Sequence, residues 1–172
     1  MIYRPVKVSI TDDMIARSRE RDQGKYNDKS FMDGAGNFVG FLGEEITHKV
    51  RPDLEFVNSF DYDFKLKNQT VDAKTKHQSV PKTPKEYYEV SICKDSLHQQ
   101  VDLYVFCRIY VDKEKYPYGW VLGGISKKEY FEKARFLKKG ERDGDNGYIV
   151  RQDCWNLRLD QLYPIKTNYS ED

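Results

Sequence analysis

Residues 60–76 read FDYDFKLKNQTVDAKTK, and the alternation of side chains in this stretch decides the fold class that we expect. Apolar and charged residues take turns on both sides of Asn68-Gln69, which is typical of strands with one buried face and one polar face. We therefore expect a strand over residues 54–66, a two-residue turn at Asn68-Gln69 and a partner strand over residues 70–76. The middle of the chain thus predicts a β-hairpin.

The polar face of this hairpin gathers acids and lysines. The expected register makes three cross-strand pairs, which are Lys67 with Thr70, Lys65 with Asp72, and Asp63 with Lys74. All six side chains share one face, and opposite or diagonal neighbours lie about 5–8 Å apart. Two carboxylates and a backbone carbonyl are hard oxygen ligands that suit Mg²⁺ or Mn²⁺, and a lysine beside the ion can activate water. The same residues also make ordinary cross-strand ion pairs, so a purely structural role stays open.

Helix and strand patterns on either side of the hairpin predict a mixed fold. Helices are expected over residues 12–21, 38–50 and 127–139, with Thr11 and Ser126 as N-caps and a polar loop over residues 23–37. Further strands are expected over residues 87–92, 101–111, 120–125, 148–150 and 155–159. This order predicts an α/β (α+β) fold in which a central mixed β-sheet is flanked by helices.

The composition excludes several classes of protein. Of the 172 residues, 38% are hydrophobic, 33% charged and 14% aromatic, which is not the composition of a disordered chain. No stretch approaches the roughly 18 apolar residues that span a bilayer, so no membrane partner is expected. Cys93, Cys107 and Cys154 share no metal-ligand spacing, and a reducing, cytoplasmic or other intracellular compartment is therefore the expected location.

The distribution of charge says more than the net charge of +1. Six lysines but one acid lie between residues 65 and 85, and seven basic residues but three acids lie between residues 127 and 142. An acidic cluster precedes them at Asp53, Glu55, Asp61 and Asp63. Acids surrounded by basic residues suit a site that holds a cation and binds a polyanion, although charge runs are also typical of a solvated surface.

The helix before the hairpin contains the sequence Gly40-Phe41-Leu42-Gly43-Glu44. Glu44 lies on the helix face opposite the apolar stripe, beside a row of glycines, whereas Glu45 lies nearer the stripe. Glycine costs about 1 kcal/mol in a helix, so the row indicates close approach of another backbone. We take Glu44 as the candidate site acid and Glu45 as its alternative.

A helix with an acid, then a strand with Asp63, then Val71-Asp72-Ala73-Lys74 resembles the PD-(D/E)xK nuclease superfamily, which has the restriction-endonuclease-like fold. The resemblance covers residues 38–137 of a single domain and leaves a helical N-terminal extension over 1–37 and C-terminal strands over 145–165. It implies that Asp63 and Asp72 bind the metal with the Ala73 carbonyl, that Lys74 is the catalytic lysine, and that Glu44 contacts the metal directly or through water. Gln99 and Gln100 lie where some relatives place a site glutamine.

The chain departs from the superfamily pattern at one position and also allows a rival register. Tyr62 precedes Asp63 where the motif name has Pro. Pro52-Asp53 followed by Asp63-Phe64-Lys65 spells the motif literally, but it leaves Asp72 and Lys74 without a role, so we rank it second.

The resemblance also implies an activity and partners. It implies a Mg²⁺-dependent deoxyribonuclease, with Mn²⁺ able to substitute, and many relatives dimerise. The DNA phosphates are then expected to be held by a set of lysines: Lys65, Lys67, Lys76, Lys82 and Lys85. Two alternatives stay open, namely a non-catalytic module that docks nucleic acid or protein on the same sheet, and an RNA-processing nuclease. The choice between endonuclease and exonuclease stays open as well.

Overall fold

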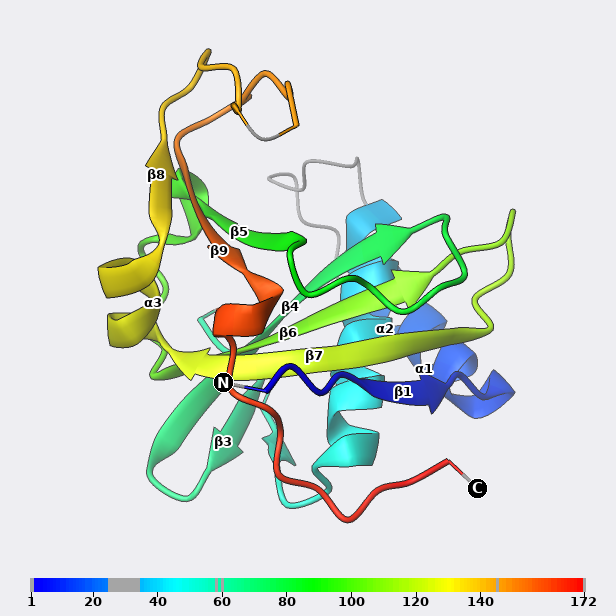
Figure 1. The fold of residues 1–172 in the computed structure, drawn as a ribbon. Helices are drawn as coiled ribbons and strands as arrows, with labels where there is room; N and C mark the ends of the chain where they lie inside the picture. Colours follow the sequence, from blue (N-terminus) through cyan, green and yellow to red (C-terminus); the bar gives the residue numbers. More distant parts are fainter. Residues whose placement is uncertain (1, 25–34, 58, 60, 145, 172) are drawn as a thin grey trace.

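The described part of the chain, residues 2–24, 35–57, 59, 61–144 and 146–171 of a computed structural model, forms two β-sheets and three α-helices (Figure 1). The larger sheet has the strand order β1 (Val6–Ser9), β7 (Tyr118–Ser126), β6 (Leu103–Tyr110), β4 (Gln69–Gln78), β3 (Phe64–Leu66) and β2 (Glu55–Phe56). The smaller sheet has the order β5 (Glu89–Cys93), β9 (Cys154–Arg158) and β8 (Arg135–Leu137). The helices are α1 (Asp12–Gly24), α2 (Ala35–Val50) and α3 (Lys127–Lys133), and two 3₁₀ turns are η1 (Lys94–Ser96) and η2 (Leu159–Gln161).

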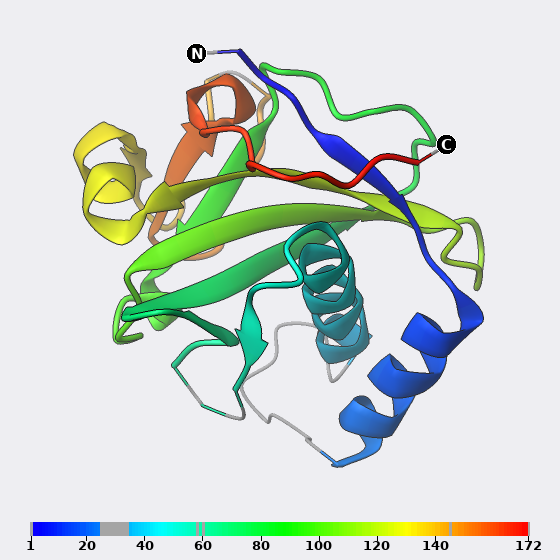
Figure 2. The same ribbon diagram turned by 90° about the horizontal axis from the view of Figure 1, so that it is seen from below.

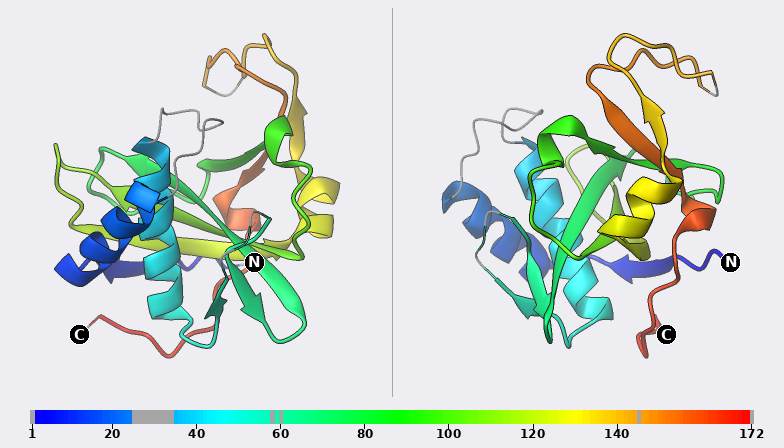
Figure 3. Two further views of the ribbon diagram at one scale, coloured as in Figure 1. Left: turned by 180° about the vertical axis from the view of Figure 1, so that it is seen from behind. Right: turned by 90° about the vertical axis from the view of Figure 1, so that its left-hand side faces the viewer.

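The larger sheet is covered on both faces. Figure 2 shows α2 against one face, and the smaller sheet with α3 against the other. Helix α1 packs beside α2, as both views of Figure 3 show. The core under α2 contains Leu42, Ile46, Phe64, Val71, Val105 and Ile109. The core between the sheets contains Ile92, Phe106, Trp120, Leu122, Tyr130 and Leu157. Burial on both faces explains why β6 and β7 read as nearly continuous apolar runs.

The predicted α/β (α+β) class is confirmed at this level, because a curled mixed sheet is combined with helices. Strands β4 and β6 are parallel, and their neighbours in the larger sheet pair antiparallel. The hydroxyl oxygen of Thr11 accepts a hydrogen bond from the Met14 amide at 3.2 Å, and that of Ser126 accepts one from the Glu129 amide at 3.1 Å. Both residues therefore cap the helices as predicted.

The hairpin forms, but its turn and its first strand differ from the prediction. The register pairs Leu66 with Gln69 and Phe64 with Val71, so the turn lies at Lys67-Asn68 and not one residue later. Lys67 adopts a left-handed φ of 54° there without being glycine. The turn moves by one residue, so the predicted pairs of Lys65 with Asp72 and of Asp63 with Lys74 are wrong, and Lys65 pairs with Thr70. The parity of the pairing is preserved, so Lys65, Asp72 and Lys74 keep one face of the two strands.

The strand expected over residues 54–66 is interrupted between β2 and β3. The Val57 amide donates to the carbonyl of Asp63 at 2.9 Å, which closes a loop between these residues. Residues 58 and 60 lie outside the described residues. Asp63 therefore stands at the base of a loop directly before β3 and not inside a continuous strand.

Three further predictions are wrong in part. The helix expected over 127–139 ends at Lys133, because Phe136 and Leu137 pair with Trp155 and Cys154 as strand β8. The N-terminal extension is not only helical, since Val6–Ser9 forms edge strand β1 on β7. The strand expected over 148–150 is only an isolated bridge between Arg142 and Ile149.

The loop expected over residues 23–37 lies outside the described residues, except at its two ends, which belong to α1 and α2. None of the helices in the described ranges combines the length and apolar character needed to cross a membrane.

Candidate functional site

Three carboxyl groups meet where the start of β3 faces the middle of β4 and the side of α2. The Asp63 amide donates to the Val71 carbonyl at 3.0 Å, although Val71 is already the register partner of Phe64. Asp63 therefore lies outside the regular ladder, as the extra residue of a bulge does. The Asp63 carboxylate accepts a hydrogen bond from the Ala73 amide at 2.8 Å. Glu44 and Asp72 both interact with the Asp63 side chain, one from the helix and one from the neighbouring strand. Asp63 is thus the centre of the cluster.

Burial and like charge make this cluster electrostatically costly. Glu44 and Asp72 are 4% and 5% exposed. Burial, together with the neighbouring carboxylate, raises the pKa of Asp63 and of Asp72 to about 7. The pKa of Glu44 is also raised by burial, against the lowering effect of its contacts with Asp63 and Arg21. Two adjacent carboxyls that resist losing both protons form a site that a proton or a cation stabilises.

Lys74 is held beside Asp72 by two polar contacts. Its ammonium nitrogen lies 2.8 Å from Asp72 Oδ2 and donates to Gln99 Oε1 at 2.7 Å. The Lys127 ammonium donates to the Gln99 carbonyl at 2.6 Å, which anchors the segment after η1 to the start of α3. Gln99 therefore orients Lys74, and Gln100 has no such contact among those we find in the described residues.

Arg21 of α1 reaches the cluster from outside the region of the superfamily resemblance. Its guanidinium donates to Glu44 at 3.1 Å and stacks over the Phe41 ring at 4.3 Å. Its Nη1 atom is buried and has no hydrogen-bond partner among the described residues. Glu45 instead pairs with Arg17 at 2.6 Å. Of the two candidate helix acids, Glu44 is therefore the one that adjoins Asp63.

Tyr104 lies next to Asp72 in the parallel register of β4 and β6. Its ring is fully buried between the sheets, and within the described ranges its hydroxyl has no hydrogen-bond partner. Burial, with the Asp72 charge adding to it, raises the pKa of the phenol. The hydroxyl thus stays protonated beside Asp72 as an available donor.

The sequence alone did not indicate Arg21 or Tyr104 as neighbours of the site. Arg21 is one of several charges on an exposed helix, and nothing in its spacing shows which residue α1 contacts. Tyr104 sits in an alternating strand whose aromatic residues are expected in the core. Only the parallel pairing of β4 with β6, which joins distant segments, brings it to Asp72.

The residues of the rival motif, Asp53, Asp63 and Lys65, do not lie together in the structure. Asp53 lies just after α2 with a 53% exposed side chain and pairs with Arg51 at 2.6 Å. Lys65 is exposed on β3 opposite Thr70. The structure thus brings Asp63, Asp72 and Lys74 together and leaves Asp53 outside this group.

The candidate phosphate-binding lysines are dispersed. Lys76 follows Lys74 on the same face of β4, opposite Arg108 of β6, and its pKa is lowered by burial and by the Arg108 charge. Lys65 and Lys67 are exposed on the β3–β4 hairpin. Strand β4 ends at Gln78, about 20 Å along the strand from Asp72, and Lys82 and Lys85 lie in the segment that follows it. Only Lys76 therefore continues the polar face directly beyond Lys74.

A divalent cation fits the donor chemistry of the cluster, although its ligands are not all in place. In the described residues, no group of three or more His, Cys, Asp and Glu side chains is arranged to hold a metal ion. The Asp63 and Asp72 carboxyls are adjacent, and the buried Asp72 Oδ2 makes an ion pair with Lys74 but no aligned hydrogen bond. Carboxylates pressed together in this way are the hard donors that Mg²⁺ takes.

Comparisons with protein-family models, with curated proteins and with solved structures each found no match to this chain.

Proposed function

We propose that the protein is a Mg²⁺-dependent nuclease that hydrolyses phosphodiester bonds in DNA through a PD-(D/E)xK-type site on a restriction-endonuclease-like core. The observation that carries the proposal is the contact of Asp72 with both Asp63 and Lys74, where the start of β3 meets β4. A divalent cation would relieve the repulsion between the paired carboxylates, and the lysine supplies a fixed positive charge beside it.

Asp63, Asp72 and the Ala73 carbonyl would hold the metal, with Glu44 contacting it directly or through water. In a strand, the N–H and C=O groups of one residue point toward the same neighbour. The Ala73 amide points at the Asp63 carboxylate, so its carbonyl borders the same gap. When bound, Mg²⁺ would supply Lewis-acid chemistry toward the phosphodiester.

Lys74 would orient the attacking water and stabilise charge that develops on the phosphoryl oxygens. Gln99 keeps its ammonium group pointed at the carboxylates. Arg21 would balance the charge of Glu44, and the Tyr104 hydroxyl would donate to Asp72. These neighbours place the reacting groups without themselves breaking a bond.

The adjoining cations suit a polyanionic substrate. Lys76 and Arg108 are directly opposite each other, and the pKa of each is lowered by burial. A phosphate beside them would relieve this crowding of positive charge. Lys65, Lys67, Lys82 and Lys85 would contact more distant phosphates along the duplex, and a homodimer would extend the contact surface.

The topology departs in one respect from the core that the superfamily resemblance implies. The connection between the parallel strands β4 and β6 contains strand β5 and turn η1, where the usual crossover between parallel strands is an α-helix. Helix α3 follows β7 instead. The proposal therefore rests on the residues at the site more than on the order of elements around it.

Cleavage of plasmid and linear DNA with and without Mg²⁺ tests the proposal. Asp72→Ala and Lys74→Ala are expected to lose at least about 100-fold in rate, because charge stabilisation and positioning at the phosphate are lost. The matched control is Asp53→Ala, which removes the first acid of the rival register and is expected to retain most of the activity. Circular dichroism of each variant separates loss of chemistry from loss of fold.

The same assay distinguishes the alternatives. Binding of nucleic acid that falls steeply with salt, without Mg²⁺-dependent turnover, would support the non-catalytic module, in which Asp72 and Lys74 are only an ion pair. Cleavage of RNA but not DNA would support an RNA-processing nuclease. A wild-type protein inert on every substrate would contradict the proposal.

A further inference from the structure

Two of the three cysteines face each other in the smaller sheet. Cys93 on β5 is the register partner of Cys154 on β9. The Lys94 amide donates to the Asp153 carbonyl at 2.9 Å, and the Leu159 amide donates to the Tyr88 carbonyl at 2.8 Å. Hydrogen-bonded and non-hydrogen-bonded pairs alternate along antiparallel strands, so Cys93 and Cys154 form a non-hydrogen-bonded pair.

This position allows a disulfide with little movement of the backbone. Opposite residues of a non-hydrogen-bonded pair have Cα atoms about 4.5 Å apart, and their side chains are on the same face. Disulfides connect Cα atoms that are about 4.4–6.8 Å apart. Both cysteines are free thiols in the structure.

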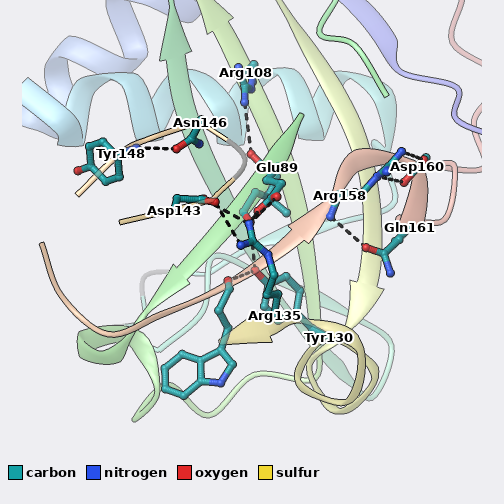
Figure 4. Close-up of polar contacts among 12 residues, drawn as sticks. Glu89, Arg108, Tyr130, Arg135, Asp143, Asn146, Tyr148, Arg158, Asp160 and Gln161 are labelled. Carbon is teal, nitrogen blue, oxygen red and sulfur yellow. Dashed lines mark hydrogen bonds and ion pairs between the residues drawn. The ribbon is translucent and has the colours of Figure 1, made fainter. Parts of the chain in front are cut away.

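Other contacts hold the same face of the sheet in place. Figure 4 shows Arg135 of β8 between Glu89 of β5 and the Asp143 carboxylate. The guanidinium lies 2.8 Å from Glu89 and 3.2 Å from Asp143. The outer strands are therefore joined across β9, which restricts sliding of Cys93 relative to Cys154.

The three thiols differ in access. Cys154 is 7% exposed and packs with Leu137 and Val150, while Cys93, at the edge of this cluster, is more exposed. Cys107 is 2% exposed in the other core, where its thiol contacts the Thr47 hydroxyl at 3.1 Å. A small oxidant in solution thus meets Cys93 first and Cys107 last.

We propose that Cys93 and Cys154 are a reversible oxidation site that forms an intrachain disulfide when the protein meets a peroxide. The Cys93 thiolate attacks the peroxide, which breaks the O–O bond, gives a sulfenic acid and releases hydroxide. The Cys154 sulfur then attacks the Cys93 sulfur and displaces its hydroxyl group as water. Two thiols and one hydrogen peroxide become one disulfide and two waters, and a dithiol reductant reverses the change.

The environment of the two thiols makes their oxidation by peroxide slow. Burial raises the pKa of both thiols, so they stay protonated near neutral pH and react only at sustained oxidant levels.

Cys93 also forms the N-cap position of η1, which leads to Gln99 and its contact with Lys74. Oxidation therefore fixes the start of the segment that reaches the candidate site. Formation of this disulfide does not depend on the proposed nuclease activity, so either proposal can be disproved without affecting the other.

Hydrogen peroxide treatment of the full chain, followed by thiol blocking and mass spectrometry, tests the inference. We expect the loss of two hydrogen atoms from the intact mass, and a peptide cross-link between Cys93 and Cys154. The Cys107→Ser variant should retain both results, whereas Cys93→Ser and Cys154→Ser should lose them. The oxidised wild type should also melt at a higher temperature than the reduced protein, with the difference removed by dithiothreitol.

Other outcomes would overturn the inference. A cross-link that involves Cys107, dimers joined through Cys93, or three free thiols after prolonged treatment with hydrogen peroxide would each contradict it. Because Cys93 is the more exposed partner, Cys93→Ser keeps the test valid even if the buried Cys154→Ser variant does not fold.

Discussion

At the scale of single residues, the cluster of Asp63, Asp72 and Glu44 is the feature that folding alone does not require. Buried carboxyls without full compensation destabilise a protein, and in the described part of the chain the Arg21 and Lys74 cations and the Ala73 amide offset them only in part. Such costs are typical of functional sites.

The acid pair makes a prediction about pH. Because the pKa of Asp72 is raised from 3.8 to about 7 in the folded state, the folded protein binds more protons than the unfolded chain over this range. The contribution of the pair to stability is therefore complete below about pH 4 and is lost as pH rises through about 7. As pH rises from about 4 to about 7 in metal-free buffer, the free energy of unfolding of Asp72→Asn should increase relative to that of the wild type by on the order of 2 kcal/mol.

Urea unfolding at a series of pH values measures this change, with Asp112→Asn, at an exposed loop position, as the control. Parallel pH curves for the wild type and Asp72→Asn would show that the two carboxyls do not share a proton.

Arg21 allows a second prediction at this scale. Arg21→Ala leaves Glu44 buried without its cation and should lower the free energy of unfolding by about 1–3 kcal/mol. Adding Glu44→Gln should recover much of the loss, because the amide carries no charge. The control is Arg158→Ala, whose exposed pair with Asp160 should contribute under about 1 kcal/mol. Additive losses in the Arg21 and Glu44 variants would argue against their coupling.

At the scale of elements, local signals predicted most of the fold. The capped helix starts at Thr11 and Ser126 and the alternation along β6 gave correct element types, because caps and periodicity are local properties. The turn was misplaced because Lys67 takes a left-handed conformation that its sequence does not signal. Asp72 and Lys74 still share one face because the parity was unchanged, whereas Asp63 lies outside the ladder and meets Asp72 through its side chain.

The contact between α2 and β4 makes a prediction at this scale. A Cβ atom on Gly43 would lie 1.8 Å from the Thr75 hydroxyl oxygen, whereas one on Gly40 would meet nothing within 4 Å. Gly43→Ala should therefore destabilise the protein by about 1–3 kcal/mol, by forcing α2 away from the strand that bears Asp72. Gly40→Ala should stabilise it by up to about 1 kcal/mol, since alanine is the better helix former. Thermal and urea unfolding of the two variants give the comparison, and equal effects would contradict the close packing seen at Gly43.

At the scale of the whole molecule, contacts between distant segments close the fold, and these were beyond sequence reasoning. Figure 2 shows the C-terminal segment beside β1 and β7. The Gly124 amide donates to the Tyr163 carbonyl at 2.9 Å, and the Thr167 hydroxyl donates to the Val50 carbonyl at 2.6 Å. Neither contact has a local signature. The short strands β1 and β8 were missed for the same reason, since their pairing partners define them.

The path of the chain through the whole molecule also explains why the sequence did not predict which lysines lie near the carboxylates. A run of lysines in the sequence shows their number but not the direction in which β4 carries them. Lys74 and Lys76 lie on β4 near the carboxylates, while Lys82 and Lys85 lie in the segment between β4 and β5. The candidate site therefore has a compact centre and an extended cationic margin.

The most direct measurement of the central claim is the anomalous scattering of crystals soaked in Mn²⁺. We predict one strong peak within coordination distance of Asp63 and Asp72, with Glu44 at its edge and the Lys74 ammonium turned toward it, and no peak at that place in Asp72→Ala crystals. A peak at Asp53 with none between β3 and β4, or no peak at saturating Mn²⁺, would contradict the account.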